Sequence, residues 1–436
     1  MESLDKIREQ FDKAPYPRVP LDKSPKEDYN SLFTHCLTTS HYLRHHRVFD
    51  TEGAVILDAG CGSGYKSLIL AEANPGARIV GIDLSEESVK LAQKRLEFHG
   101  FDNVEFHAML VEDLPRLGMQ FDYINCDEVL YLLPDAAEGL KAMKSVLKPT
   151  GLIRTNLHSQ LQRQVFYHAQ EFFRLIGLMD QNPREEELAI VTATMKALKP
   201  DVVIKSNTWG PQYEKPESEG MLLSNHLLLG DKGFSIPQVF DLLDQTNLDF
   251  VSMVNWRHWE VADLFKEPDN LPVLWGMSLM EADIRDRLTL YELMNPVNRL
   301  LDFWCAHPAE GDAPLPLAGW ESSDWQGAIA HLHPLLRRST IREEAMSCIQ
   351  ASKSFNFTKY IDLPALGQVE LDRMELAVLL PLWDGPQSFQ ALVERYQTLL
   401  PINPITLQPL TLADAQASVQ SLLSKLEVFL YVLVER

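Results

Sequence analysis

The sequence predicts an α/β protein built on a doubly wound, Rossmann-like parallel sheet. Two observations carry this prediction: apolar runs of strand type alternate with helical segments from residue 54 onward, and a glycine-rich turn follows the first run. The expected strands are 54–58, 79–83, 104–108, 121–126 and 151–156, with helices over 65–73, 86–99 and 136–147. Such alternation indicates a parallel sheet covered by helices, which binds ligands at the carboxyl ends of its strands.

Composition restricts the class of protein further. A chain of 436 residues exceeds one ordinary core, so we expect about two or three domains. An apolar content of 45% and a charged content of 23% are typical of a globular protein. The formal net charge of −21 disfavours nucleic acid as a partner, because phosphate contacts need clustered Lys and Arg.

The sequence also favours a reducing, cytoplasmic location. Its five cysteines show no C-x-x-C spacing, so we expect neither a disulfide framework nor a metal site; they are Cys36, Cys61, Cys126, Cys305 and Cys348. The N-terminal segment MESLDKIREQF is charged rather than signal-like, and no apolar run approaches the length of a membrane span. We therefore expect no membrane partner.

The first strand and its turn carry the strongest functional signal. The run Val55-Ile-Leu-Asp58 is followed by glycines at alternate positions, Gly60, Gly62 and Gly64, and the second run ends in Asp83. Glycine permits the sharp turn and close backbone approach that a nucleotide-type ligand needs, and an acid ending the second strand accepts hydrogen bonds from ribose hydroxyls. Asp58 before the glycines disfavours a pyrophosphate but suits an ammonium or a sulfonium.

This D-x-G-x-G-x-G segment resembles motif I of the class I S-adenosylmethionine (SAM)-dependent methyltransferases. The resemblance implies SAM as the cofactor, with Asp58 and the backbone from Gly60 to Gly62 facing its methionine portion and Asp83 binding its ribose. The implied cofactor-binding residues are Asp58, Gly60, Cys61, Gly62, Gly64, Asp83, Leu84, Val111, Glu112, Asp113 and Cys126.

The segment after the third strand departs from the family pattern. The resemblance places the adenine edge there, usually with an aspartate four residues beyond the aromatic residue of the strand. Counted from Phe106, that position is Leu110. The adenine amine is then left to the backbone of Val111 and Glu112 or to the carboxylates of Glu112 and Asp113, unless these acids only cap the following turn.

Candidate catalytic residues follow the fourth and fifth strands. Asp127 and Glu128 come directly after Cys126, where the resemblance places the transferred methyl group. An acid there can orient or deprotonate an amine or amide acceptor, although one of the two acids binding the SAM ammonium is an equal alternative. His158 after the fifth strand is a further candidate base, with a structural hydrogen bond as the other interpretation.

The remaining segments predict the domain organisation. Residues 1–50, with a PYPR entry segment, form an arm over the cofactor, and 51–256 form the methyltransferase domain, whose last strand we expect at 248–254. Helical residues 160–228 are inserted as a substrate lid, 257–316 form a helical connector, and 317–436 form a mainly α accessory domain. This last part resembles the C-terminal domain of some bacterial protein methyltransferases.

We therefore expect a SAM-dependent methyltransferase that acts on a protein side chain, with N-methylation favoured. A methyltransferase acting on a small molecule is the first alternative, and a non-catalytic SAM-binding scaffold is the second. The expected partner is the methyl acceptor, whether protein or small molecule.

Overall fold

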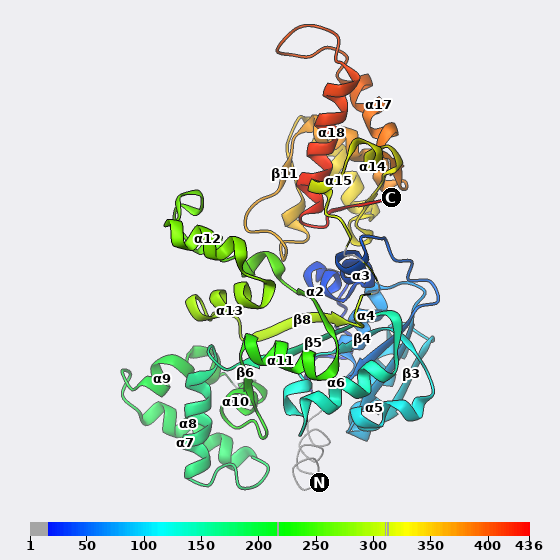
Figure 1. The fold of residues 1–436 in the computed structure, drawn as a ribbon. Helices are drawn as coiled ribbons and strands as arrows, with labels where there is room; N and C mark the ends of the chain where they lie inside the picture. Colours follow the sequence, from blue (N-terminus) through cyan, green and yellow to red (C-terminus); the bar gives the residue numbers. More distant parts are fainter. Residues whose placement is uncertain (1–15, 216–217, 310, 312–313) are drawn as a thin grey trace.

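The computed structural model describes residues 16–215, 218–309, 311 and 314–436. Figure 1 shows a central sheet domain, a helical lobe of α7 to α10 beside it at the lower left, and a C-terminal domain above it. The first part of the predicted arm, residues 1–15, lies outside the described residues.

The central sheet confirms the predicted doubly wound α/β fold. Its order is β3-β2-β1-β4-β5-β8-β7, with a short strand, β6, paired with β5, and β8 runs antiparallel to both of its neighbours, β5 and β7. The strands are β1 (Val55–Ala59), β2 (Arg78–Asp83), β3 (Val104–Ala108), β4 (Phe121–Cys126), β5 (Leu147–Ser159), β6 (Gly233–Phe234), β7 (Asp249–Met253) and β8 (Leu300–Ala306). The carboxyl ends of the parallel strands therefore meet at one edge, as the sequence predicts.

Helices cover both faces of this sheet. One face packs against α3 (Leu37–His45), α4 (Tyr65–Ala73) and α5 (Glu86–Phe98), with α2 (Tyr29–His35) lying against α4, and the other face packs against α6 (Ala136–Ser145) and α11 (Ile236–Thr246). Local sequence sets where these helices begin. Ser85 caps α5 by accepting a hydrogen bond from the Ser88 N–H at 3.1 Å, and Asp135 caps α6 through the N–H groups of Ala137 and Glu138.

The prediction of a helical connector over 257–316 is wrong for the second half of this segment. The segment holds α12 (Val273–Glu281) and α13 (Ile284–Met294), but its end forms β8 between β5 and β7. Pro296 disfavours a helical conformation at the residue before it, and the run that follows is apolar on both faces, as in a central strand. The boundary expected at residue 256 therefore falls inside the sheet domain.

The helical insertion forms a lobe with its own small core. It contains α7 (Gln164–Leu175), α8 (Glu185–Ala197), α9 (Val203–Thr208) and α10 (Glu219–His226). Phe173, Val191 and Met195 are buried at its centre. The lobe follows directly on the carboxyl end of β5, so it stands beside the edge where the candidate site lies (Figure 1).

The C-terminal domain is mainly helical and shares its core with the N-terminal helices. It contains α14 (Ser322–Gly327), α15 (Ser339–Ala351), α16 (Arg373–Leu379), α17 (Phe389–Leu399) and α18 (Leu412–Glu427), the sheet of β12 (Gln387–Ser388), β9 (Ile329–Leu332) and β13 (Val432–Glu435), and the strand pair of β10 (Phe355–Asn356) and β11 (Glu370–Leu371). Leu32 and Phe33 of α2 are buried in the same apolar cluster as Val434. The Tyr42 hydroxyl donates to the Val434 carbonyl at 3.0 Å, so α2 and α3 join the two domains.

Candidate active site

The glycine loop after β1 is crowded by protein on two sides. Gly60 has φ +86°, and a Cβ there would lie 2.3 Å from Val129 Cγ2. A Cβ on Gly62, which has φ +50°, would lie 2.1 Å from the carbonyl oxygen of Tyr16. Gly64 has φ +80° and packs against Ala92 of α5. Glycine is thus required at all three positions by backbone conformation and by close approach.

The N-terminal arm lies directly on this loop. Ser63 donates its N–H to the Tyr16 carbonyl at 2.8 Å and its hydroxyl to the Pro17 carbonyl at 2.7 Å. Arg95, 1% exposed, holds the next turn of the arm through the carbonyls of Val19 and Pro20. These contacts place the described part of the arm over the predicted cofactor loop.

Asp83 ends β2 and turns its carboxylate toward the glycine loop. Its oxygens accept hydrogen bonds from the Gly62 N–H at 2.8 Å and the Ser85 N–H at 2.9 Å. Beyond it lies a cavity of 630 Å³ at the carboxyl ends of β2 and β3, lined by Leu84, Glu86, Glu87, Ala108, Met109, Leu110, Asp113 and Arg116. Two of the predicted cofactor-binding residues, Leu84 and Asp113, thus line one cavity, and Leu84 is next in sequence to Asp83.

The other residues expected at the adenine edge lie in the turn after β3. Val111 is buried, and one carboxylate oxygen of Glu112, Oε2, is buried without a hydrogen-bond partner among the described residues. A buried acceptor without a donor is costly, so this oxygen suits a ligand that brings an N–H group. Asp113 instead pairs with Arg116 at 3.1 Å.

Asp58 is buried in the wall of the site. It is 1% exposed, and its oxygens accept hydrogen bonds from the Ser67 hydroxyl at 2.6 Å and the Asn125 amide at 2.8 Å. Burial raises the pKa of Asp58 to about 6, against the lowering effect of these two hydrogen bonds. Cys61 and Cys126 are buried as well, and burial raises the pKa of both thiols. The structure therefore places these three side chains in the protein interior.

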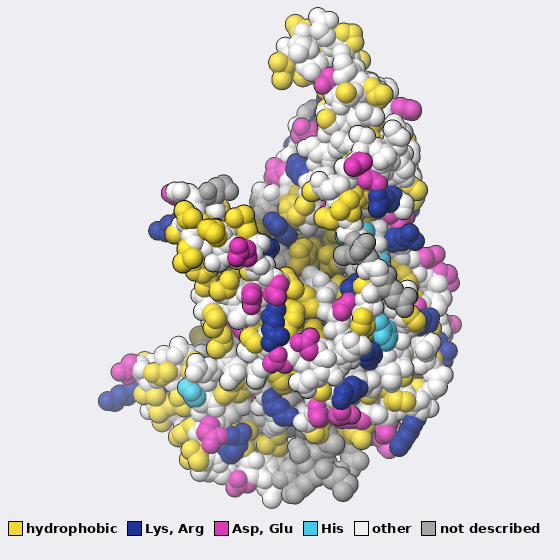
Figure 2. Space-filling model, viewed as in Figure 1, with side chains coloured by type: hydrophobic (Ala, Val, Ile, Leu, Met, Phe, Trp, Pro, Cys, Tyr) yellow, Lys and Arg dark blue, Asp and Glu magenta, His cyan; other side chains and the backbone are white. Residues whose placement is uncertain are grey.

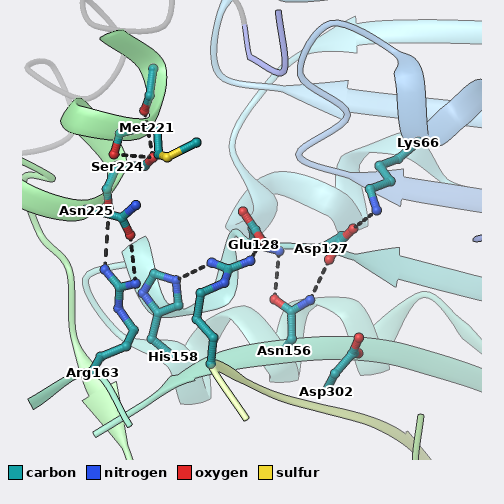
Figure 3. Close-up of polar contacts among 12 residues, drawn as sticks. Lys66, Asp127, Glu128, Asn156, His158, Arg163, Met221, Ser224, Asn225 and Asp302 are labelled. Atoms are coloured by element: carbon teal, nitrogen blue, oxygen red, sulfur yellow. Dashed lines mark hydrogen bonds and ion pairs between the residues drawn. The ribbon is translucent and has the colours of Figure 1, made fainter. Parts of the chain in front are cut away.

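Asp127, directly after β4, is surrounded by cations. Its carboxylate lies 2.8 Å from Lys66 Nζ and 3.5 Å from the Arg154 guanidinium, and it accepts a hydrogen bond from the Asn156 amide (Figure 3). Burial raises the pKa of Asp127, but the charges of Arg154 and Lys66 lower it more, and the net pKa lies well below its usual value. A carboxylate held ionised in this way is a poor proton acceptor at neutral pH, which argues against the predicted base role.

Glu128 points away from Asp127, as expected for neighbouring residues in a loop after a strand. Its backbone has φ +58°, an uncommon value for a residue other than glycine. The Glu128 N–H donates to the Asn156 side-chain oxygen at 2.8 Å, and its carboxylate pairs with Arg299. Asn156 therefore fixes both acids, through the side chain of one and the backbone of the other.

His158 belongs to a second group of polar residues at the end of β5. Its Nδ1 lies 2.6 Å from the Asp231 carboxylate, its Nε2 lies 3.1 Å from the Arg299 guanidinium, and its ring stacks on Tyr131 at 3.9 Å. Burial lowers the pKa of His158, although Asp231 acts in the opposite direction. The ring is thus a neutral link between Asp231 and Arg299.

A second cavity, of 420 Å³, has Lys66 in its wall. Its lining comes from α2, α4, β5, β8, the loops before β8 and after β7, and the C-terminal domain; the residues are Asn30, Ser31, Thr34, His35, Lys66, Arg154, Val254, Asn255, Asn298, Arg299, Leu300, Asp302 and Leu363. Sequence reasoning missed Lys66, Arg154 and Asp302, because these ionic residues come from distant segments without a motif.

Within the described part of the chain, no three His, Cys, Asp or Glu side chains are placed to hold a metal ion. Across those same residues, no helix is both long and apolar enough to cross a membrane. All five cysteines are free thiols.

Comparison with known proteins agrees with this geometry. Residues 50–216 match the family model described as a methyltransferase domain. The chain therefore carries a class I SAM-dependent methyltransferase domain, with SAM as its cofactor.

Individual relatives extend the likeness beyond that domain. An uncharacterized protein of Synechococcus is 25% identical over 324 residues, which cover 72% of this chain and 73% of that protein. The PKMT2 structure from Rickettsia typhi covers 93% of this chain and 75% of its own, at 17% identity and a TM-score of 0.57; its complex with AdoHcy gives 0.59. At this identity the likeness shows a shared fold.

A shorter match is to the ubiquinone biosynthesis O-methyltransferase of Bordetella avium. It is 37% identical over 106 residues, 23% of this chain and 42% of that enzyme. The chain thus spans less than half of this relative.

Proposed function

We propose that the chain transfers the methyl group of SAM to a side chain of another protein. The observation that carries this proposal is the exposed apolar surface beside the second cavity. Helix α12 exposes Val273, Leu274, Met277 and Met280, and contiguous apolar surface of this kind is typical of protein interaction sites. Figure 2 shows apolar side chains over α12 and in the hollow between this helix and the C-terminal domain.

Further exposed apolar side chains come just before the cavity in the sequence. Leu293, Met294 and Val297 are exposed at the end of α13 and in the loop that follows. The next residue, Asn298, lines the second cavity. An acceptor protein can therefore dock on apolar side chains while one of its own side chains enters a polar cavity, whereas a small acceptor has no use for the outer surface.

The cofactor half of the site fits SAM. When bound, SAM supplies an activated methyl group on a sulfonium. Asp83 ends β2 beside the glycine loop, where a carboxylate can accept hydrogen bonds from ribose hydroxyls, and the unpaired oxygen of Glu112 can accept an N–H of the adenine amine. Bound SAM would contact Leu84, Val111 and Asp113, and the glycine loop and the arm would cover the rest of the cofactor.

For the two acids after β4, the contacts favour an electrostatic role. Asp127 is held ionised between Lys66 and Arg154, so it is suited to attract an ammonium or a sulfonium rather than to remove a proton. His158 is tied to Asp231 and Arg299 and is suited to hold Arg299 in place. We assign His158 a positioning role on this ground.

The helical lobe is proposed as the lid over the acceptor side. Arg163, fully buried at the start of α7, donates to Asp231 at 3.0 Å and to Asn225 of α10 at 3.1 Å. The same Asp231 contacts His158, so hydrogen bonds connect the lobe to the site. We propose residues 317–436 as an accessory domain that completes the wall of the second cavity through Leu363.

Transfer of label identifies the acceptor class. The full chain would be incubated with SAM carrying a tritiated methyl group and with bacterial lysate separated into protein and small-molecule fractions. We expect label in protein bands, and none with the Asp83→Ala variant. Label only in small molecules would establish the alternative that the short match to the ubiquinone biosynthesis O-methyltransferase supports. Tight SAM binding without labelled product would establish a non-catalytic scaffold.

A further inference from the structure

Helix α12 has an inner face that packs on the protein and an outer face that does not. On the inner face, Trp275 packs on the Phe265 ring at 5.6 Å, and Leu279 packs against the core of the sheet domain. The four exposed apolar side chains from Val273 to Met280 follow the spacing i, i+1, i+4 and i+7, so they share the opposite face. Each of them is 52–79% exposed, so no described part of the chain covers this outer face.

The outer face of α12 belongs to an ordered helix and has a gap in its apolar row. Arg287 donates to the carbonyl groups of Leu279 at 2.9 Å and Ala282 at 3.1 Å, which satisfies carbonyl groups at the end of the helix. Gly276 lies one turn before Met280, and a Cβ added there would meet nothing within 4 Å. A large apolar side chain of a partner can therefore approach the helix backbone at Gly276.

Acidic side chains lie at the end of this face. Glu281 is the i+4 neighbour of Met277 and lies on the same face, and Asp283 and Asp286 follow at the start of α13. All three acids are exposed, and none of them forms an ion pair within the described chain. Figure 2 shows acidic side chains beside the apolar surface over α12. The apolar row is thus followed by unpaired negative charge.

The neighbouring cations do not compensate this charge. Arg285 pairs with Asp241 of α11 at 2.6 Å and lies 3.6 Å from Asp244. Arg287 is engaged by the carbonyl groups at the end of α12. The whole segment 257–297 carries eight Asp and Glu residues against four Lys and Arg. A partner that fits this face therefore carries positive charge at the end that meets Glu281.

We propose that the outer face of α12 binds an amphipathic helix of the acceptor protein, with an apolar row that ends in Lys or Arg. The apolar row packs on the flexible side chains of Met277 and Met280 and into the gap at Gly276, and the cations pair with the acids that begin at Glu281. The inference rests on the proposed function, because it names the part of the acceptor protein that binds outside the second cavity.

Two other occupants fit this face less well. The α12 face of a second copy carries acids and no Lys or Arg, so it brings no cation to pair with Glu281. An anionic membrane surface would be repelled by the same acids. Charge therefore favours a basic partner protein over either of them.

Matched peptides test this inference directly. The first probe is an Ala-based helical peptide of about 20 residues with a Leu row at i, i+4 spacing and Lys residues at its C-terminal end. One control peptide replaces the Lys residues with Gln, and another replaces the Leu row with Ala. Binding to the full chain would be measured by fluorescence anisotropy in saturating S-adenosylhomocysteine (AdoHcy). We expect the Lys peptide to bind at least about tenfold more tightly than either control.

Two variants assign the binding to the face of α12. Leu274→Glu puts a charge in the apolar row and should weaken binding of the Lys peptide about tenfold or more. Glu281→Lys should remove the preference for the Lys peptide over the Gln peptide. The matched controls are Leu407→Glu, at a leucine that is 75% exposed where Leu274 is 77% exposed, and Asp102→Lys, at another exposed acid. Neither control should change peptide binding, and all four variants should bind AdoHcy as the wild type does.

The same variants separate this inference from the proposed function. Equal binding of the Lys and Gln peptides, or equal effects of Leu274→Glu and Leu407→Glu, would overturn the inference. Self-association of the chain that Leu274→Glu abolishes would overturn it in favour of a second copy, and loss of binding to phosphatidylserine vesicles in favour of a membrane. Specific binding of the Lys peptide by a wild-type chain that labels no lysate protein would support this docking face and contradict the proposed function alone.

Discussion

The two cavities are built from the sequence in opposite ways. The first cavity takes its lining from two short stretches, after β2 and after β3. The second takes its lining from α2, α4, β5, β8 and the C-terminal domain. The cofactor side is therefore encoded locally, by motifs at strand ends, whereas the acceptor side exists only once distant segments have folded together.

The largest expected effect is on stability and concerns Arg154, the central cation of the second cavity. Arg154→Met leaves Asp302 and Asp127 without this buried cation, and breaking such a pair costs about 3–5 kcal/mol of unfolding free energy. Urea denaturation would measure this loss of unfolding free energy. Arg174→Met, which removes an exposed pair with Glu171, should cost at most about 1 kcal/mol. Similar losses in both variants would show that the acceptor side does not depend on its buried network.

A second prediction concerns Asp83, at the cofactor side. Asp83→Ala removes a charged acceptor from the Gly62 N–H and from the proposed ribose hydroxyls, so AdoHcy affinity should fall about 100-fold, or ~3 kcal/mol. Calorimetry of AdoHcy binding would measure this loss of affinity. Asp102→Ala changes an exposed acid shortly before β3 and should leave the affinity unchanged. An unchanged affinity in Asp83→Ala would remove the cofactor assignment of the first cavity.

The third prediction separates backbone strain from contact with the arm. Gly53 has φ +73°, and a Cβ added there would have nothing within 4 Å, whereas a Cβ on Gly62 meets the Tyr16 carbonyl. Gly53→Ala should therefore cost only about 1 kcal/mol for its conformation. Gly62→Ala should cost more and also weaken AdoHcy binding, because the arm must move. Thermal unfolding and calorimetry would be compared, and equal effects of the two substitutions would argue against a role for the arm.

The sequence predicts the sheet, the glycine loop and Asp83 because each depends on neighbouring residues. It fails at β8, since a run of six apolar residues interrupted by Asp302 fits both a buried strand and a helix until its partners β5 and β7 are known. The roles of Lys66, Arg154 and Asp302 are invisible for the same reason: each is an ordinary charged residue until Asp127 lies beside it. The position of Asp127 directly after β4 predicts that it belongs to the site, but the neighbouring cations Lys66 and Arg154 determine its chemical role.

The smallest expected effect is a pH dependence of stability that comes from Asp302. Burial and the charge of Asp127 raise the pKa of Asp302 to about 6, although Arg154 lowers it. Above pH 6 Asp302 is ionised; below pH 6 it binds a proton in the folded chain more tightly than in the unfolded chain. The nearby His35 stays neutral, since burial and Arg154 hold its pKa well below its usual value.

From pH 8 to pH 5, Asp302 should therefore add about 1 kcal/mol to the free energy of unfolding measured by urea denaturation, because a raised pKa means tighter proton binding in the folded state. In Asp302→Asn this gain should be absent, because the group that titrates is gone. Equal pH dependence of the wild type and this variant would show that the fold does not raise the pKa of Asp302.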